Sequence, residues 1–247
     1  MSKRRIEDEE SDIDISSTDS ENEQEEEEEI VNIDFDFFDV DKDVDFHAVK
    51  NLMRQLIGEE SKKLNLSALA DLVLGAPTTT IKTDGKESDP YAFLAPINMK
   101  EAKSSDYIKF IHKSDSELSN TLNRISNKRV ALLLSERLIN MPIQIVPAMY
   151  KIVLEETEKS EGEHYDYYVI PSRKYEVNDE AEDNSNKRVK TVEVDYYHHE
   201  DKFLEENATH YTQLEPKNGL IQTFIVIGHD ELNKAIGELE DAIAAAF

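Results

Sequence analysis

The sequence predicts a single α/β domain over residues 32–247, preceded by an acidic tail over residues 1–31. Strand-like and helix-like patterns interleave through one continuous apolar core, which is typical of an α/β domain. Two apolar runs, at 130–134 and 224–227, lack alternating polar residues, as central strands covered on both faces do. Acidic residues, by contrast, are concentrated at the N-terminal end, where few apolar residues are available to build a core.

The tail carries most of the charge. The chain has 54 acidic and 28 basic side chains in 247 residues, a formal net charge of −26. Residues 1–45 hold 20 of the acids and four of the bases. From residue 2 to residue 29 only three isoleucines are sizeable hydrophobes, too few to offset an ordering entropy of ~1–2 kcal/mol per residue. We therefore expect residues 1–31 to be a disordered tail.

The acidic run at 25–29 has two interpretations. It is either a solubilising tail or an electrostatic attractor for a strongly basic partner. In the second case the client contacts are Glu25, Glu26, Glu27, Glu28 and Glu29. Four hydroxyl residues upstream each have an acid three positions on, a spacing that acid-directed kinases favour. These candidate phosphorylation sites are Ser11, Ser16, Thr18 and Ser20.

Two short basic clusters are candidate nuclear import signals. The first comprises Lys3, Arg4 and Arg5, and the second comprises Lys187, Arg188 and Lys190. The second cluster lies in a polar stretch that we expect to form a mobile loop at about 176–190. An exposed loop is a suitable place for a recognition signal.

Charge and composition exclude several functions. A chain this acidic repels phosphate backbones and anionic membrane surfaces, so no direct binding to nucleic acid or membrane is expected. No apolar run approaches the ~18 residues of a membrane helix, and no apolar signal core follows the N-terminus. The chain has no cysteine, which excludes disulfides and thiolate metal sites and fits a reducing, intracellular compartment.

The first elements of the domain are predicted from periodicity. Ile and Phe alternate with Asp at 33–37, the pattern of a strand with one buried face. Apolar residues then recur at helical spacing over 46–57 and 66–74, and a glycine follows each helix as a stop signal. Strands are expected at 78–83 and 91–97, joined through the turn dipeptide Asp84-Gly85, with Pro96 at a bulge or a sheet edge.

The rest of the domain continues the alternation. Each of the two apolar runs precedes an amphipathic helix, and Asp230 is the expected N-cap of the last one. Further strands are expected at 165–170 and 191–196. Helices are expected at roughly 101–126 and 198–207.

Motifs for catalysis and cofactor binding are absent from the sequence. The seven glycines are too dispersed for a dinucleotide fingerprint or a phosphate-binding loop, and no serine lies in a GxSxG motif. His198-His199-Glu200-Asp201 lacks HExxH spacing and is better explained as the solvated start of a helix than as a metal site. The residues therefore favour a binding protein over an enzyme, with no cofactor and no metal.

Four segments together resemble the BCCIP family, which includes the fungal Bcp-type nuclear transport proteins. They are DFDFFD at 34–39, DFHAVKNL at 45–52, TDG with SDPYAF within 83–93, and the segment at 134–150 that begins LSERLINMP. The likeness runs from about residue 33 to the C-terminal strand and helix. The region around 178–190 is its least family-like part.

The resemblance implies a fold and a function. The implied fold is a mixed central sheet with helices on both faces, similar to that of the GCN5-related N-acetyltransferases. The implied function is a non-enzymatic nuclear escort, or chaperone, that guards a basic large-subunit ribosomal protein, supports ribosome biogenesis and assists nuclear export of cargo. Implied partners also include nuclear transport factors and a lipid kinase cargo, and the implied location is the nucleus, with shuttling to the cytoplasm.

One part of the family pattern is a candidate surface. Ser135, Glu136 and Arg137 leave a predicted central strand, a point at which ligands of α/β sheets often bind, although they equally suit a cap of the next helix. Two other functions stay open: an acetyl-CoA-dependent N-acetyltransferase, active or degenerate, and a scaffold with several partners. The first lacks a glycine-containing phosphate loop, and Asp230 and Glu231 would repel phosphate at the last helix.

Overall fold

The computed structural model describes residues 33–179 and 191–246. The chain divides into a unit of residues 1–33 and a compact unit of residues 34–247, to which every described helix and strand belongs. The elements in chain order are β1 (Asp36–Asp39), α1 (Phe46–Ile57), η1 (Gly58–Lys63), α2 (Leu66–Gly75), β2 (Thr79–Lys82), β3 (Ala92–Asn98), α3 (Asp106–Ser114), α4 (Ser116–Arg124), β4 (Val130–Arg137), η2 (Ile143–Ile145), α5 (Val146–Glu161), β5 (Tyr167–Asp179), β6 (Thr191–Tyr196), α6 (Asp201–Glu206), β7 (His210–Gln213), β8 (Leu220–Gly228) and α7 (His229–Ala246).

The strands form one eight-stranded mixed sheet. Its order is β1-β2-β3-β4-β5-β8-β7, and β6 pairs with the outer part of β5. Only β4 and β5 pair in parallel, and all other pairs of described strands are antiparallel. The single domain with a mixed sheet flanked by helices is therefore confirmed.

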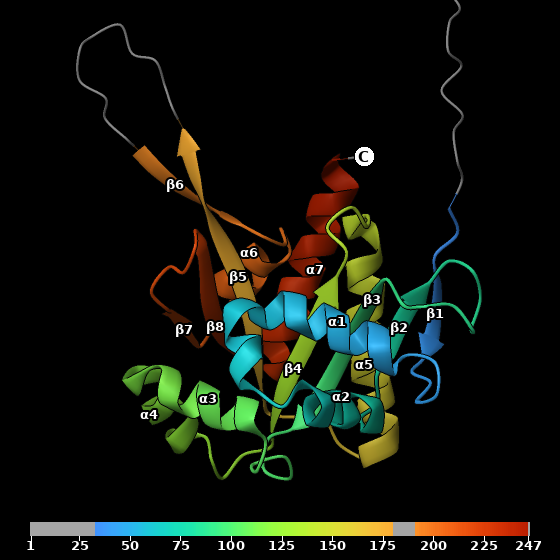
Figure 1. Cartoon of the computed structure of the whole chain (residues 1–247), viewed down its shortest axis with the longest axis horizontal. Helices are drawn as coiled ribbons and strands as arrows, with labels where there is room; N and C mark the ends of the chain where they lie inside the picture. The colour runs from blue at the N-terminus through green and yellow to red at the C-terminus, as the bar shows by residue number, and fades with distance from the viewer. Residues whose placement is uncertain (1–32, 180–190, 247) are drawn as a thin grey trace, which may run out of the picture. The chain divides into compact units, whose positions relative to one another are not determined.

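Helices cover both faces of the sheet, as Figure 1 shows. Along β4, Leu132 and Leu134 pack toward α1 to α4, whereas Ala131 and Leu133 pack toward α5 and α7. Strand β8 alternates in the same way between the two cores. Because side chains of a strand point alternately to opposite faces, a continuous apolar run is what a sheet with two covered faces requires.

Several predicted boundaries are confirmed. Helix α1 ends at Gly58, whose φ of 62° suits glycine, and α2 begins where the side chain of Asn65 accepts a hydrogen bond from the backbone N–H of Ala68. Strand β2 pairs with β3 only at Ala92–Leu94, so Pro96 lies where β3 has a partner on one side alone.

Helical structure is confirmed within the predicted stretch 101–126, where it forms two helices, α3 and α4, whose division was not predicted. Asp115 has extended backbone angles, and its carboxylate accepts a hydrogen bond from the backbone N–H of Leu118, which starts α4 as a new helix. The strand at 33–37 is also displaced: β1 begins at Asp36, and Ile33 is 56% exposed.

The predicted mobile loop at 176–190 is wrong over its first four residues. Strand β5 continues to Asp179, and its residues 174–179 pair with β6 in a hairpin. Residues 180–190 lie outside the described part of the chain. A second hairpin, β7–β8, is not predicted, although the Asn218-Gly219 dipeptide at its turn is a strong hairpin signal.

Candidate binding surface

The parallel strands β4 and β5 separate after a short paired stretch. They pair only at Val130–Leu132 with Tyr167–Val169. Further along, β6 takes up the edge of β5, starting with the pairing of Lys174 with Tyr196. The end of β4 and the middle of β5 therefore face each other across a gap in the sheet, and the side chains in this gap are charged.

Glu136 of β4 and Arg173 of β5 form an ion pair across this gap. Nη2 of Arg173 donates to Oε2 of Glu136 at 2.5 Å, and Nε2 of His198 lies 3.0 Å from Oε1 of the same carboxylate. The guanidinium also donates to the carbonyl of Gln55 and stacks over the Tyr197 ring at 3.8 Å. Because Glu136 is only 1% exposed, its charge depends on these partners.

Arg137, the last residue of β4, forms a second buried ion pair. Its Nε and Nη2 donate to the two carboxylate oxygens of Glu200 at 3.0 and 2.8 Å, and its Nη1 donates to the carbonyl of Met141. Burial alone would raise the pKa of Glu200, but the hydrogen bonds and charge of Arg137 lower that pKa below its usual value. One guanidinium thus joins β4, the turn that follows it and the start of α6.

Asp201 follows Glu200 in the chain, but its pKa is shifted in the opposite direction. Burial, together with the negative charge of Glu200, raises the pKa of Asp201 to about 7. Its carboxylate accepts a hydrogen bond of 2.5 Å from the hydroxyl of Ser172 on β5. The prediction of a solvated helix start at 198–201 is therefore wrong for His198, Glu200 and Asp201, which are buried.

The prediction of a surface at Ser135, Glu136 and Arg137 is wrong for its two charged residues. Strand β4 runs through Arg137, which leaves Ser135 half-buried and buries Glu136 and Arg137 in the ion pairs. The same family segment also contains an exposed large hydrophobe, Ile139, which lies in the turn after β4 with 64% of its surface accessible. A single exposed apolar side chain is common on protein surfaces, and it indicates an interaction surface only where other exposed apolar side chains accompany it.

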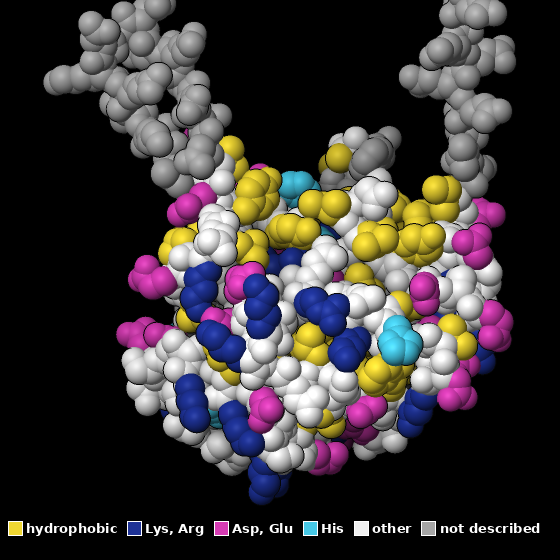
Figure 2. Space-filling model, in the orientation of Figure 1, with side chains coloured by type: hydrophobic (Ala, Val, Ile, Leu, Met, Phe, Trp, Pro, Cys, Tyr) yellow, Lys and Arg dark blue, Asp and Glu magenta, His cyan; other side chains and the backbone are white. Residues whose placement is uncertain are grey.

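Two further exposed hydrophobes lie at the same end of the sheet. Because β4 and β5 run in parallel, Tyr175 and Val194, in the outer part of the β5–β6 hairpin, lie toward the same end as Ile139. The 83–91 loop lies at this end of the sheet as well, because Ala92, the first residue of β3, pairs with Arg137, the last residue of β4. The loop carries three exposed acids, Asp84, Glu87 and Asp89. Figure 2 shows apolar side chains gathered along the top of the molecule.

We call this region the β4 end: residues 83–91, residues 138–141 and the two described arms of the outer β5–β6 hairpin, 175–179 and 191–195. Glu193, on β6, adds another exposed acid. The region combines exposed apolar side chains with carboxylates, a combination that suits a basic protein surface.

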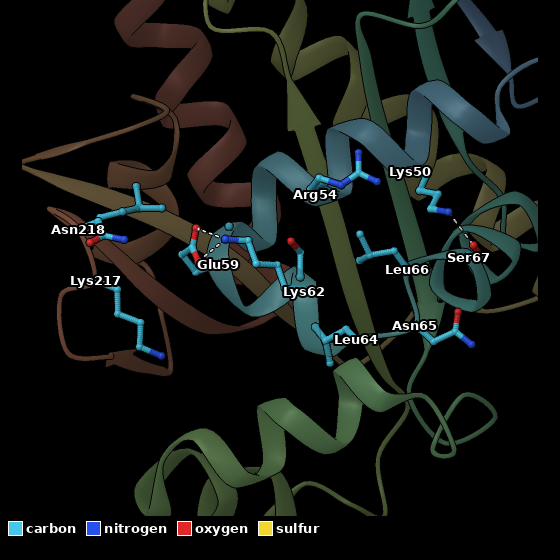
Figure 3. A pocket seen from close by; sticks show the side chains of 13 residues that line it. Lys50, Arg54, Glu59, Lys62, Leu64, Asn65, Leu66, Ser67, Lys217 and Asn218 are labelled. Carbon is cyan, nitrogen blue, oxygen red and sulfur yellow. Dashed lines mark hydrogen bonds and ion pairs between the residues drawn. The ribbon is translucent and has the colours of Figure 1, made fainter.

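A second candidate site is a groove of about 860 Å³ beside α1 (Figure 3). Its walls come from α1, from η1 and the start of α2 with the segment that joins them, and from the β7–β8 turn. Leu64, Leu66 and Leu220 supply its apolar surface. Its cationic side chains are Lys50, Arg54, Lys62 and Lys217, and Glu59 is the one acid among the lining residues. We call it the basic groove.

The other predicted sites cannot be placed. The candidate phosphorylation sites, both candidate import signals and the acidic run all lie outside the described residues. Among the described residues, no group of three or more metal-ligating side chains is suitably placed for a metal ion, and no helix is long and apolar enough to span a membrane.

Similarity to known proteins fits this architecture. The BCCIP family model matches residues 30–204. This chain belongs to the BCCIP family. The matched region runs from β1 into α6, so it contains the whole buried network and the β4 end, whereas Lys217 of the basic groove lies beyond it.

Curated BCCIP-family relatives cover most of the chain. Protein BCP1 of Candida glabrata is 55% identical over an alignment of 215 residues, and the match covers 82% of this chain and 78% of the relative. Protein BCP1 of Saccharomyces cerevisiae is 51% identical over 221 residues, with the same coverage. The crystal structure of BCP1 from Saccharomyces cerevisiae aligns with a TM-score of 0.76, over 90% of this chain and 94% of that one.

Sequence reasoning missed Arg173 and Tyr197 as members of the buried network and Ile139 as an exposed residue of the β4 end. A signal for the first is present: in both β4 and β5 a buried apolar run ends in two successive charged residues, at 136–137 and 173–174. Two neighbouring strands with the same signature indicate a shared charged layer.

Proposed function

We propose that this protein is a non-enzymatic nuclear escort that binds a basic large-subunit ribosomal protein before assembly. The supporting observation is the β4 end, where Ile139, Tyr175 and Val194 are exposed among carboxylates. Apolar contacts at such a surface slow dissociation, while the net charge of −26 speeds the approach of a basic client.

The escort role has a physical basis. Ribosomal proteins carry dense positive charge that attracts RNA and other polyanions. An acidic partner with apolar anchors covers that charge and excludes competing polyanions until the client reaches its assembly site. Support for ribosome biogenesis, shuttling from the nucleus, export of cargo such as a lipid kinase, and contact with nuclear transport factors all belong to this proposal.

We also propose that the fold is similar to that of the GCN5-related N-acetyltransferases and that the protein has no acetyltransferase activity. The gap where the parallel strands β4 and β5 diverge is filled by the side chains of Glu136, Arg173 and His198. At the N-terminus of α7, the carboxylate of Glu231 packs against Gly228, and the His229 ring stacks on His164 at 4.0 Å. An anionic side chain at this position opposes the binding of a phosphate group.

The escort function is tested with a purified basic large-subunit ribosomal protein and an RNA fragment. The two are mixed at low salt, and turbidity reports co-aggregation. Equimolar full-length protein is expected to suppress the turbidity. Polyglutamate of matched total charge is the control, and it should protect less at the same charge concentration. Equal protection by polyglutamate would show that the folded surface adds nothing, and would overturn the proposal.

A further inference from the structure

The basic groove has a charge opposite to that of the whole chain. Glu59 pairs with Lys62 at 2.6 Å, and Glu60 pairs with Lys217. Lys50 donates instead to the hydroxyl of Ser67 at 2.8 Å. Arg54 donates to the side-chain oxygen of Asn51 at 2.6 Å. Among the described residues, therefore, neither Lys50 nor Arg54 is neutralised by a carboxylate.

The cations are spread along the groove rather than gathered at one point. Figure 3 shows Lys50 at one end and Lys217 at the other, with Arg54 and Leu66 between them. Leu64 and Leu220 add further apolar surface. A compact anion would need converging donors, whereas this arrangement fits an elongated ligand that carries separate carboxylates and apolar groups.

The wall formed by the β7–β8 turn is held in place. Asn218 and Gly219 have φ values of 55° and 76°, and Lys217 and Leu220 exchange two backbone hydrogen bonds, as in a tight two-residue hairpin turn. Glu60 joins this turn to η1 by accepting from both Lys217 and Lys63. Because this wall is already ordered, less conformational entropy is lost when a ligand binds.

We propose that the basic groove binds a short acidic peptide segment of a partner protein. The carboxylates of the peptide lie against Lys50 and Arg54, and its apolar side chains lie against Leu64, Leu66 and Leu220. The basic client of the escort function is repelled from these cations, so the groove and the β4 end take different partners. The inference does not depend on the escort function.

Single-stranded RNA fits the groove less well. A long polyanion is repelled by the net charge of −26, whereas a short peptide experiences chiefly the charges within a Debye length of about 8 Å. No aromatic side chain is among the lining residues, and stacking on aromatic rings is the usual source of affinity for single-stranded bases.

The test is fluorescence anisotropy with the full chain and a labelled peptide of about eight residues, extended to about 26 Å, in which Asp or Glu alternates with Leu or Phe. Saturable binding that weakens as salt is added is expected. Arg54→Glu should raise the dissociation constant roughly tenfold, because it replaces an attraction with a repulsion. A peptide with Asn and Gln in place of its acids should lose most of the affinity.

Arg124→Glu is the matched control. Arg124 is also exposed, lies in the last turn of its helix, α4, and makes no ion pair with a described residue. The control should change the dissociation constant by less than about twofold, since it makes the same charge change away from the groove. Equal losses in the two variants, no saturable binding, or tighter binding of an RNA oligonucleotide of the same length would each overturn the proposal.

Discussion

Arg137 and Glu200 form a bidentate ion pair between the last residue of β4 and the residue before α6, with nitrogen–oxygen distances of 3.0 and 2.8 Å. Both side chains are buried, and the third donor of Arg137 holds the Met141 carbonyl in the turn that carries Ile139. The turn that carries Ile139, one of the exposed apolar residues of the β4 end, is thus held by a buried ion pair.

Arg137→Met is expected to lower the free energy of unfolding by about 3–5 kcal/mol, because it leaves the Glu200 carboxylate buried without its cation. Urea denaturation measures the loss. The double variant Arg137→Met, Glu200→Leu should recover most of it, since no unpaired charge remains. Lys234→Met removes a surface pair with Glu238 and should cost less than about 0.5 kcal/mol. A cost of Arg137→Met no larger than that of this control would refute the structural role of the pair.

Asp201 should make stability depend on pH. Its pKa is about 7 in the folded protein and about 4 in an unfolded chain, so between these values the folded state binds more protons. The stabilising contribution of Asp201 is full below about pH 4 and is lost as pH rises through about 7. Glu200, whose pKa is lowered, contributes in the opposite direction, with stability that is lost on acidification.

Asp201→Asn isolates this effect, because Asn still accepts the hydrogen bond from Ser172. The free energy of unfolding of the variant minus that of the unmodified protein should be at least about 1 kcal/mol larger at pH 8 than at pH 5. Urea midpoints at the two pH values give the comparison. A difference that does not change with pH would mean that Asp201 keeps an ordinary pKa.

Ile139→Asn should weaken binding to the basic client about five- to thirtyfold, corresponding to about 1–2 kcal/mol from lost apolar contact. Because Ile139 is 64% exposed, the melting temperature should hardly move. Ile139→Leu, which keeps the apolar area, should bind normally. Surface-based binding kinetics with purified client measure both variants, and equal affinities for all three proteins would exclude Ile139 from the interface.

Deletion of residues 1–30 should slow association with the client by about tenfold at low salt and leave dissociation nearly unchanged. A chain segment held by screened charges makes few desolvated contacts, and its attraction fades when the Debye length falls below about 8 Å. At about 0.5 M salt the two proteins should associate at similar rates. Faster dissociation with an unchanged association rate would instead make the tail a binding element.

Calorimetric titration with acetyl-CoA should give no heat above dilution. The sequence has no glycine-containing phosphate loop, and the carboxylate of Glu231 lies at the N-terminus of α7, where a negative charge opposes the binding of phosphate. Glu231→Ala tests whether that carboxylate is the obstacle. Micromolar affinity of the unmodified protein for acetyl-CoA would instead favour the acetyltransferase alternative.

Local patterns predicted most of the fold. The helical spacing from Phe46 to Ile57 and the glycine after it placed α1, and the apolar runs placed β4 and β8, because these signals are contained in a few consecutive residues. The split of 101–126 into two helices was missed because a single N-cap, Asp115, interrupts an otherwise continuous pattern.

The candidate surface was less predictable, because its residues meet only through the sheet. Glu136 and Arg173 are 37 positions apart, and their contact requires β4 and β5 to be parallel neighbours that then diverge. Periodicity does not specify strand order. The basic groove presents the same difficulty, since Lys217 reaches η1 from 157 residues beyond Glu60.

Strand β5 has a consequence for how the domain opens. It pairs with β4, β6 and β8, so it connects the two halves of the sheet. The amides of its first residues, around Val169, are flanked by strands on both edges and can exchange with deuterium only when one half separates from the other. We expect them to exchange with the free energy of global unfolding, whereas the outer β5–β6 hairpin exchanges through a smaller, local opening. The surface that would meet a client can then fluctuate without loosening the core beneath it.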